Sequence, residues 1–341
     1  MGRVAPRTTK RRAVVSAQTT TKRGEGSDRN PYLFVVGCPR SGTTLLQRML
    51  DNHPRLAVAN DSHFIPRAVE DVAVGTDPPL TPELVERVRT YRRFYRLDLP
   101  DAAVDEAAKE ARTYREFVSA LYSEYGRLRG KPLAGEKTPG YVRHLPCLHA
   151  LFPWARTIHI IRDGRDVYLS TMNWGSAFKI ARRFTGWDED PVTAVALWWE
   201  LKVRLGREDG EPLGAGLYQE VRYESLASRP EQELATLCEF LRLSYDDAML
   251  HFHEGRQKPG LDAKKAWLPA TPGLRDWRSQ MPSEDIARFE AAAGELLDEL
   301  GYPRAVPDPP REMLGNAARL RVSFVRDVLA RGERLPEVWK P

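Results

Sequence analysis

The feature that most constrains the fold is an apolar run followed by a glycine-containing turn. Residues 32–36 read Tyr-Leu-Phe-Val-Val, which predicts a buried strand. Gly37 and Gly42 follow it at the spacing of the two glycines in the phosphate-binding pattern G-x-x-x-x-G-K-[ST]. A loop of this kind curls around a phosphate and presents backbone N–H groups at the start of a helix. We therefore expect an α/β fold with an anion site at the end of this strand.

The loop differs from that pattern at the position that decides which anion it binds. Thr43 stands where a nucleotide triphosphatase has the lysine that reaches the β- and γ-phosphates. The nearest cation is Arg40, two residues before Gly42. This substitution argues against ATP or GTP hydrolysis and favours a 5′-phosphate-like anion that is not a triphosphate.

A second segment has the same character. Residues 156–161 read Arg-Thr-Ile-His-Ile-Ile, which predicts another buried strand, and Arg162 follows directly. A guanidinium offers forked donors to phosphate oxygens, and the hydroxyl of Ser170, eight positions on, can add one more bond. The alternative for Arg162 is an ordinary ion pair with Asp163 or Asp166.

Residues 39–44 (Pro-Arg-Ser-Gly-Thr-Thr) and 156–170 together resemble the cofactor-binding segments of sulfotransferases, enzymes that use 3′-phosphoadenosine 5′-phosphosulfate (PAPS). The resemblance implies that the loop holds the 5′-phosphosulfate, that Arg40 stabilises the transferring group, and that the cofactor's 3′-phosphate binds to Arg162 and Ser170. Residues 219–226 resemble the family's R-Y-E-x-L strand end, which implies that Tyr223 lies against the adenine, although a core tyrosine is the alternative. The implied cofactor contacts are Arg40, Ser41, Gly42, Thr43, Thr44, Arg162, Ser170 and Tyr223.

Two further segments resemble the acceptor side of the same family. Residues 135–141 resemble its K-[TD]-P segment, which implies that Lys137 neutralises charge on the leaving phosphate. Residues 61–64 (Asp-Ser-His-Phe) are similar to the E-x-H-F of the heparan-type branch, and the stretch as a whole is nearest to the tyrosylprotein and heparan-type branches. Asp61 is then the expected general base, with His63 as the alternative. An aspartate base gives an acid limb well below pH 6, and a histidine base gives one near 6.5.

The resemblance covers about residues 31–301 and includes residues 273–278 (Gly-Leu-Arg-Asp-Trp-Arg), which are similar to a segment that closes over the cofactor. The R-K-G triplet of cytosolic hormone-type members is missing before it. Lys264 and Lys265 lie upstream and are candidates to replace it.

The expected fold is a three-layer α/β structure with a central parallel sheet flanked by helices. We expect strands near 32–37, 56–60, 156–161 and 217–223. The expected organisation is a disordered basic tail (1–30), a sulfotransferase domain (31–305) with a helical insert (66–130), and a C-terminal extension (306–341). The arginines at 87, 89, 92, 93 and 96 of the insert face either an anionic acceptor or solvent, and residues 174–187 are expected beside the acceptor pocket.

Composition bounds the remaining possibilities. Residues 1–30 hold eight of the basic residues and two acidic ones, so the other 311 residues are almost neutral, with 44 basic and 45 acidic. The three cysteines are scattered, which suits a reducing cytoplasm, and no apolar run is long enough to span a bilayer. We expect no metal, no specific nucleic acid, and a small-molecule, carbohydrate or peptide acceptor. A P-loop kinase and a nucleotide-binding scaffold are the alternative functions.

Overall fold

The computed structural model describes residues 29–173, 183–254 and 269–340. Within them lies a sheet of five strands, all parallel, in the order β2-β3-β1-β4-β5. The strands are β1 (Leu33–Gly37), β2 (Leu56–Asn60), β3 (Leu133–Lys137), β4 (Arg156–Ile161) and β5 (Tyr218–Arg222). The α/β prediction is confirmed, and four of the strands lie where the sequence placed them. The sequence analysis missed β3, a short strand whose last two residues are charged.

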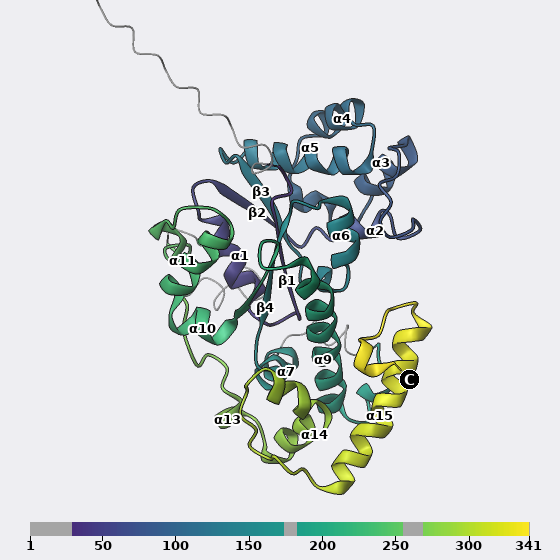
Figure 1. The fold of residues 1–341 in the computed structure, drawn as a ribbon, viewed down its shortest axis with the longest axis vertical. Coiled ribbons are helices and arrows are strands. Elements are labelled where there is room, and N and C mark those ends of the chain that lie inside the picture. The colour runs from purple at the N-terminus through teal and green to yellow at the C-terminus, as the bar shows by residue number, and fades with distance from the viewer. Residues whose placement is uncertain (1–28, 174–182, 255–268, 341) are drawn as a thin grey trace, which may run out of the picture.

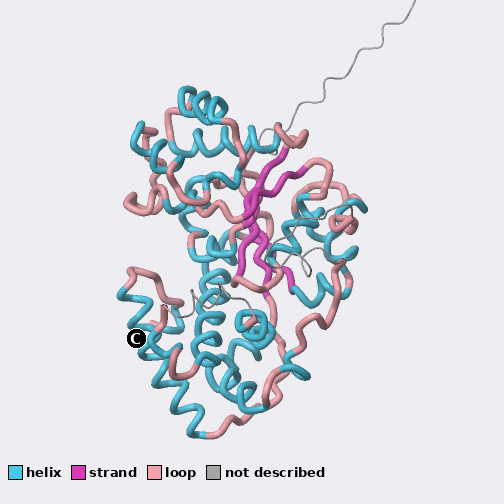
Figure 2. Tube along the Cα trace, turned by 180° about the vertical axis from the view of Figure 1, so that it is seen from behind, coloured by secondary structure: helices cyan, strands magenta, loops and turns pink. Residues whose placement is uncertain are grey.

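Helices cover both faces of the sheet (Figures 1 and 2). One face carries α1 (Thr43–Asp51), α10 (Tyr223–Ser228) and α11 (Pro230–Phe240), whose apolar residues form one core with the strands. The other face carries α5 (Tyr114–Arg127), α6 (Leu145–Leu151) and α9 (Pro191–Gly210). Trp198 and Trp199 of α9 are buried, as expected for core residues. The two helical layers cover both faces of the sheet. A ligand can therefore approach the sheet at the carboxyl ends of its strands.

The predicted insert is helical and packs as a cap over one end of the sheet (Figure 1). Thr81 caps the first helix of eight or more residues in this region, because its side chain accepts a hydrogen bond from the N–H of Leu84. The elements of this region are α2 (Phe64–Arg67), α3 (Pro82–Arg89), the 3-10 helix η1 (Phe94–Leu97), α4 (Asp101–Glu110) and the first part of α5.

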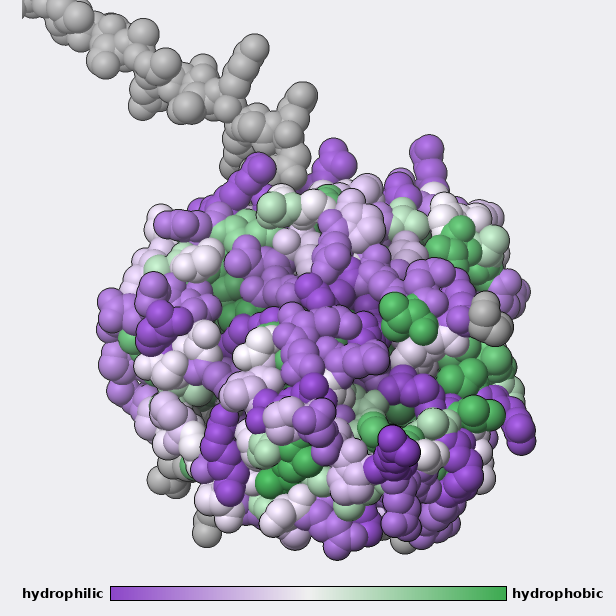
Figure 3. Space-filling view, turned by 60° about the horizontal axis from the view of Figure 1, so that its bottom comes forward, coloured by the Kyte–Doolittle hydropathy of each residue, from purple (hydrophilic) through white to green (hydrophobic). Residues whose placement is uncertain are grey.

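The opposite end of the molecule is helical as well (Figure 1). Its elements are α7 (Gly164–Met172), η3 (Thr185–Trp187), α13 (Trp277–Gln280), α14 (Ser283–Glu299) and α15 (Arg311–Ala330). Phe324 and Val328 of α15 are buried against the core formed by α9 and α14, so this helix packs onto that core. The face seen in Figure 3 is mostly hydrophilic, with hydrophobic side chains in small separate groups. No described helix is both long enough and apolar enough to cross a membrane.

Candidate active site

All the predicted site residues lie at the carboxyl edge of the sheet. The 37–43 loop follows β1, Asp61 follows β2, Lys137 ends β3, Arg162 follows β4, and Tyr223 follows β5. In open parallel sheets, ligands bind at this edge, where strands on either side of a crevice lead away in opposite directions. Here β1 leads to β2 on one side and β4 leads to β5 on the other, so the crevice lies between β1 and β4.

The loop after β1 has the geometry of an anion site. Gly42 lies in the left-handed region with φ of 92°, and a Cβ there would come within 2.3 Å of the Tyr223 ring. Arg40 is also left-handed, with φ of 79°, a strained conformation that tends to occur at functional sites. Helix α1 begins next with no side-chain cap and no acidic residue in its first turn. Its first N–H groups are therefore oriented for an anion.

The two predicted cofactor segments contact each other directly. The Nε of Arg40 donates to the Oγ of Ser170 at 3.0 Å, and a terminal nitrogen of Arg162 donates to the carbonyl of Arg40 at 3.5 Å. The guanidinium of Arg162 also lies 4.1 Å from the centre of the Tyr223 ring. These contacts place the implied 5′- and 3′-phosphate groups of the cofactor beside the same loop.

Two buried donors here have no acceptor, which fits a bound phosphate. The hydroxyl of Ser41 is fully buried and makes no hydrogen bond, and the same is true of the Nε of Arg162. Leaving a buried polar group without a partner costs free energy, and a ligand oxygen removes that cost. The residues present therefore fit the phosphate groups of PAPS.

The ion pair considered as an alternative for Arg162 also exists. Asp166 accepts from Arg162 at 3.3 Å, whereas Asp163 pairs with Arg165. Burial raises the pKa of Asp166 to about 6. Its other oxygen accepts from the N–H of Trp277 at 2.9 Å. Asp166 thus links the predicted 3′-phosphate residue to the 273–278 segment, a connection that the sequence analysis did not identify.

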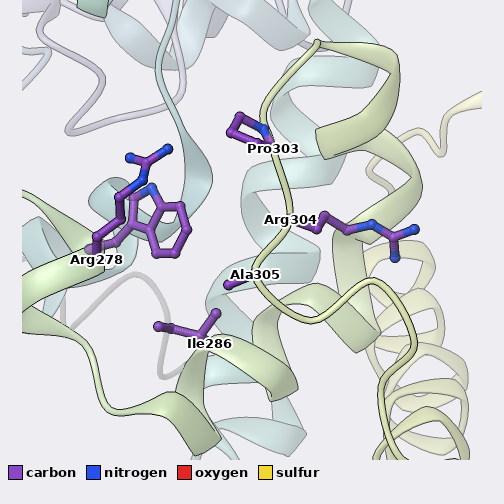
Figure 4. Close-up of a pocket in the computed structure, with 6 residues that line it drawn as sticks. Arg278, Ile286, Pro303, Arg304 and Ala305 are labelled. Carbon is purple, nitrogen blue, oxygen red and sulfur yellow. The ribbon is translucent and has the colours of Figure 1, made fainter.

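A buried cation lies against the ring of Trp277. The guanidinium of Arg165, which is fully buried, lies 3.5 Å from the centre of the Trp277 ring and pairs with Glu290 at 2.5 Å. A cavity of about 300 Å³ lies beside this tryptophan. Figure 4 shows it between α13 and the 303–305 segment, with the side chain of Arg304 pointing away. The cavity therefore adjoins the part of the chain expected to cover the cofactor.

The acceptor side centres on a buried lysine. The Nζ of Lys137, whose side chain is 1% exposed, lies 3.1 Å from Oδ1 of Asp61 and 3.4 Å from Oγ1 of Thr44. The Nε2 of His63 lies 4.0 Å from the same carboxylate oxygen. The structure therefore brings the predicted base, its alternative and the predicted leaving-group cation together, beside the phosphate-binding loop.

The structure changes what a pH profile can show. Burial, together with the nearby cations Arg93, Lys137 and Arg92, lowers the pKa of His63 to about 4 against the opposing effect of Asp61. We expected an acid limb near 6.5 from a histidine base. The lowered pKa of His63 contradicts that expectation, because most of the imidazole is removed from solvent and the nearby cations Arg93, Lys137 and Arg92 disfavour its protonation. Substitutions of Asp61 and His63 are therefore the direct way to distinguish the two candidate bases.

A buried carboxylate that the sequence analysis passed over supports this cluster. Glu136 precedes Lys137, is fully buried, and accepts a hydrogen bond from the hydroxyl of Tyr122 at 2.6 Å. The sequence signal that could have identified Glu136 was its place after the apolar residues 133–135, two positions before Thr138-Pro139. Several predictions fall outside the described residues, namely the tail through residue 28, the 174–182 part of the expected pocket wall, Lys264 and Lys265.

Comparison with known proteins agrees with this geometry. A profile of the sulfotransferase family matches residues 31–247. The chain is 26% identical over 301 residues to protein-tyrosine sulfotransferase A of Caenorhabditis elegans, covering 85% of this chain and 72% of that protein. It is 29% identical over 297 residues to a putative protein-tyrosine sulfotransferase of Caenorhabditis briggsae, covering 83% and 93%. The human protein-tyrosine sulfotransferase 1 is 26% identical over 306 residues, covering 85% and 76%.

Solved structures show the same fold. The sulfotransferase domain of the Synechococcus olefin synthase superimposes with a TM-score of 0.53 at 24% identity, covering 82% of this chain and 97% of that one. The sulfotransferase domain of the curacin biosynthetic pathway gives a TM-score of 0.52 at 20% identity, covering 80% and 98%.

The fold and site define a nucleotide-dependent transferase that lacks the lysine of a triphosphatase. This chain belongs to the sulfotransferase family. It is a PAPS-dependent enzyme that moves a sulfuryl group to an acceptor, and the kinase and scaffold alternatives are not favoured.

Proposed function

We propose that the acceptor is the phenolic hydroxyl of a tyrosine in an acidic peptide segment. The observation that carries the proposal is that Asp61, His63 and Lys137 lie together near arginines of the insert. Arg92 and Arg93 act electrostatically on His63, and Arg96 acts on Lys137. These cations favour an acceptor with negative charge next to its hydroxyl. The curated relatives act, by their names, on protein tyrosine.

In this reaction the acceptor oxygen attacks sulfur while the bond from sulfur to the bridging phosphate oxygen breaks. Asp61 takes the proton of the hydroxyl. Lys137 and Arg40, with the N–H groups that begin α1, stabilise the charge that builds on the leaving phosphate and the sulfuryl oxygens. Arg162 and Ser170 hold the 3′-phosphate of the donor. Nothing in these steps requires a metal, and the described residues contain no group of three or more metal-ligating side chains.

The test is an assay with labelled PAPS and four acceptors. They are a peptide with tyrosine between acidic residues, the same peptide with neutral neighbours, its phenylalanine counterpart, and a small phenol. We expect the acidic tyrosine peptide to react with the highest kcat/KM and the phenylalanine peptide not to react. Equal turnover of the acidic and neutral peptides contradicts the proposed acceptor, as does a preference for the phenol.

Two variants connect this preference to the arginines. Arg92→Ala with Arg93→Ala removes two cations beside His63, so KM for the acidic peptide should rise about 10-fold or more while KM for the phenol changes little. Arg89→Ala is the matched control, because Arg89 pairs with Asp105 within the insert. We also propose that the protein works in the cytoplasm, which fractionation of the native host's cells would test.

A further inference from the structure

Glu136 is a buried charge in contact with the catalytic cluster. Successive side chains of a strand point to opposite faces. Lys137 therefore points toward the phosphate-binding loop, where it contacts Thr44, and Glu136 points toward α5, where it contacts Tyr122. Its side chain is fully buried in the described structure. A buried carboxylate is costly unless it is compensated by hydrogen bonds or a countercharge.

Three donors meet this carboxylate. Its Oε1 accepts from the backbone N–H of Ser62 at 2.8 Å and from the hydroxyl of Thr138 at 2.5 Å, and its Oε2 accepts from Tyr122 at 2.6 Å. The N–H can only donate, and both hydroxyls are placed to donate. This arrangement fits an ionised carboxylate, which accepts at both oxygens.

The bond to Ser62 lies at the centre of a strained turn. Asp61 and His63, on either side of Ser62, have φ of 59° and 63°, in the left-handed region that residues other than glycine rarely adopt. Such conformations persist where the surroundings hold them in place. Here the N–H of Asp61 donates to the carbonyl of Lys137 at 2.7 Å, and the N–H of Ser62 donates to Glu136. The end of β3 thus fixes the turn that carries the proposed base.

We propose that Glu136 is a positioning residue for sulfuryl transfer: its carboxylate holds the strained turn that aims Asp61 at the acceptor, and it places a negative charge next to Lys137 on β3, on the side away from the leaving phosphate. The inference rests on the roles proposed above for Asp61 and Lys137. Neither role requires Glu136 to touch the substrate.

The charges around Lys137 support the second half of the inference. Burial lowers the pKa of Lys137, and Arg96 lowers it further. The carboxylates of Asp61 and Glu136 oppose this and raise it. Burial raises the pKa of Glu136 itself, and its three hydrogen-bond donors counteract that shift. If Glu136 is replaced by a neutral residue, Lys137 keeps only Asp61 as a countercharge and loses its proton at lower pH.

The experiment compares Glu136→Gln with Tyr122→Phe. Glu136→Gln is nearly the same size and removes the charge, whereas Tyr122→Phe removes one donor and keeps the charge. We expect Glu136→Gln to lower kcat at least 10-fold and to move the alkaline limb of the kcat profile to lower pH. Tyr122→Phe should lower kcat less and leave the alkaline limb in place. Binding of 3′,5′-phosphoadenosine, measured by calorimetry, should stay within a factor of about three in both.

Several outcomes overturn the inference. It fails if Glu136→Gln keeps wild-type kcat, or if kcat falls while the alkaline limb does not move. If Glu136→Gln does not fold, Tyr122→Phe decides, because unchanged kcat in that variant shows that the buried carboxylate need not be held. Asp61→Asn is measured in parallel. If that variant keeps wild-type turnover, the proposed role of Asp61 fails, and if it is inactive while Glu136→Gln is normal, only the present inference fails.

Discussion

The cofactor half and the acceptor half of this site are built in different ways. On the cofactor half, the side chains predicted to bind the cofactor contact one another, as Arg40 contacts Ser170 and Arg162 contacts Tyr223. On the acceptor half, Lys137 and Asp61 pair, but the turn beneath Asp61 is held by Glu136, which is oriented by a tyrosine of α5.

This difference indicates which parts of the fold each half of the site depends on. The cofactor half is formed by the loops that follow β1 and β4 and by the helices α1, α7 and α10 that follow these strands and β5, none of which belongs to the insert. The acceptor half depends on α5 and η1, which belong to or border the insert, so changes there reach the acceptor before they reach the nucleotide. Substitutions that affect one half and not the other are therefore the way to test this comparison.

The largest expected effect is on the acceptor half. Asp61→Asn keeps the shape of the side chain but removes the basic group, so turnover should fall by about 10²- to 10⁴-fold. Affinity for 3′,5′-phosphoadenosine should barely change. Steady-state kinetics and calorimetry check the two values. His63→Ala is the comparison variant and should lower turnover less, and the reverse order would assign the base to His63.

On the cofactor half we expect a smaller effect, and one on nucleotide binding instead of turnover. Arg162→Ala leaves Asp166 as a buried charge without its partner and removes the reader of the 3′-phosphate. Binding of 3′,5′-phosphoadenosine should weaken by about 2–5 kcal/mol, while binding of AMP, which has no 3′-phosphate, changes little. Calorimetry with both nucleotides measures the difference. Arg229→Ala, at an exposed position between α10 and α11, is the control. Equal losses for the two nucleotides would contradict a 3′-phosphate role.

The smallest effect concerns stability and pH. Burial lowers the pKa of His63, His149 and His159 to about 4 and of His144 to about 3. An unfolded histidine titrates near 6.5, so between these values the unfolded chain binds more protons than the native one. The free energy of unfolding should therefore be highest above about pH 6.5 and should fall as the pH drops toward 4.

Urea unfolding at a series of pH values measures this fall. His159→Gln removes one fully buried imidazole from β4 and should make the curve shallower in that range. His251→Gln is the control, because His251 is exposed and its carboxylate neighbours raise its pKa instead. A stability that stays constant from pH 7 to pH 5 would mean that the buried histidines are protonated without cost.

The structure brings together the residues that the sequence assigned to the cofactor half, and they could be picked out because they lie in continuous segments with fixed spacing. Gly37, Gly42 and Arg162 each follow an apolar run that predicts a strand, so their place at the end of a strand could be recognised from the sequence. The acceptor half was predicted only in its reacting groups. The contact of Tyr122 with Glu136 joins residues 14 positions apart on different elements, and no spacing rule marks it. The link from Asp166 to Trp277, 111 positions away, was unpredictable for the same reason.

Strand β3 shows why the rest was missed. It has five residues, of which Leu133, Ala134 and Gly135 give a weak apolar signal and Glu136 and Lys137 give none. Burial of charged residues in a central strand runs against the usual pattern of apolar strands. It occurs here because each charge has a partner that only the folded structure supplies.

The alternation of side chains along β3 has a consequence for how this enzyme can change over time. β3 lies between β2 and β1, so its register is fixed from both sides. A shift of one residue would turn Glu136 toward the sulfuryl group and Lys137 toward the aromatic layer under α5. An acid would then repel the donor, and an ammonium would lie among rings without a countercharge. A single insertion or deletion within residues 133–137 is therefore expected to disrupt both sulfuryl transfer and folding.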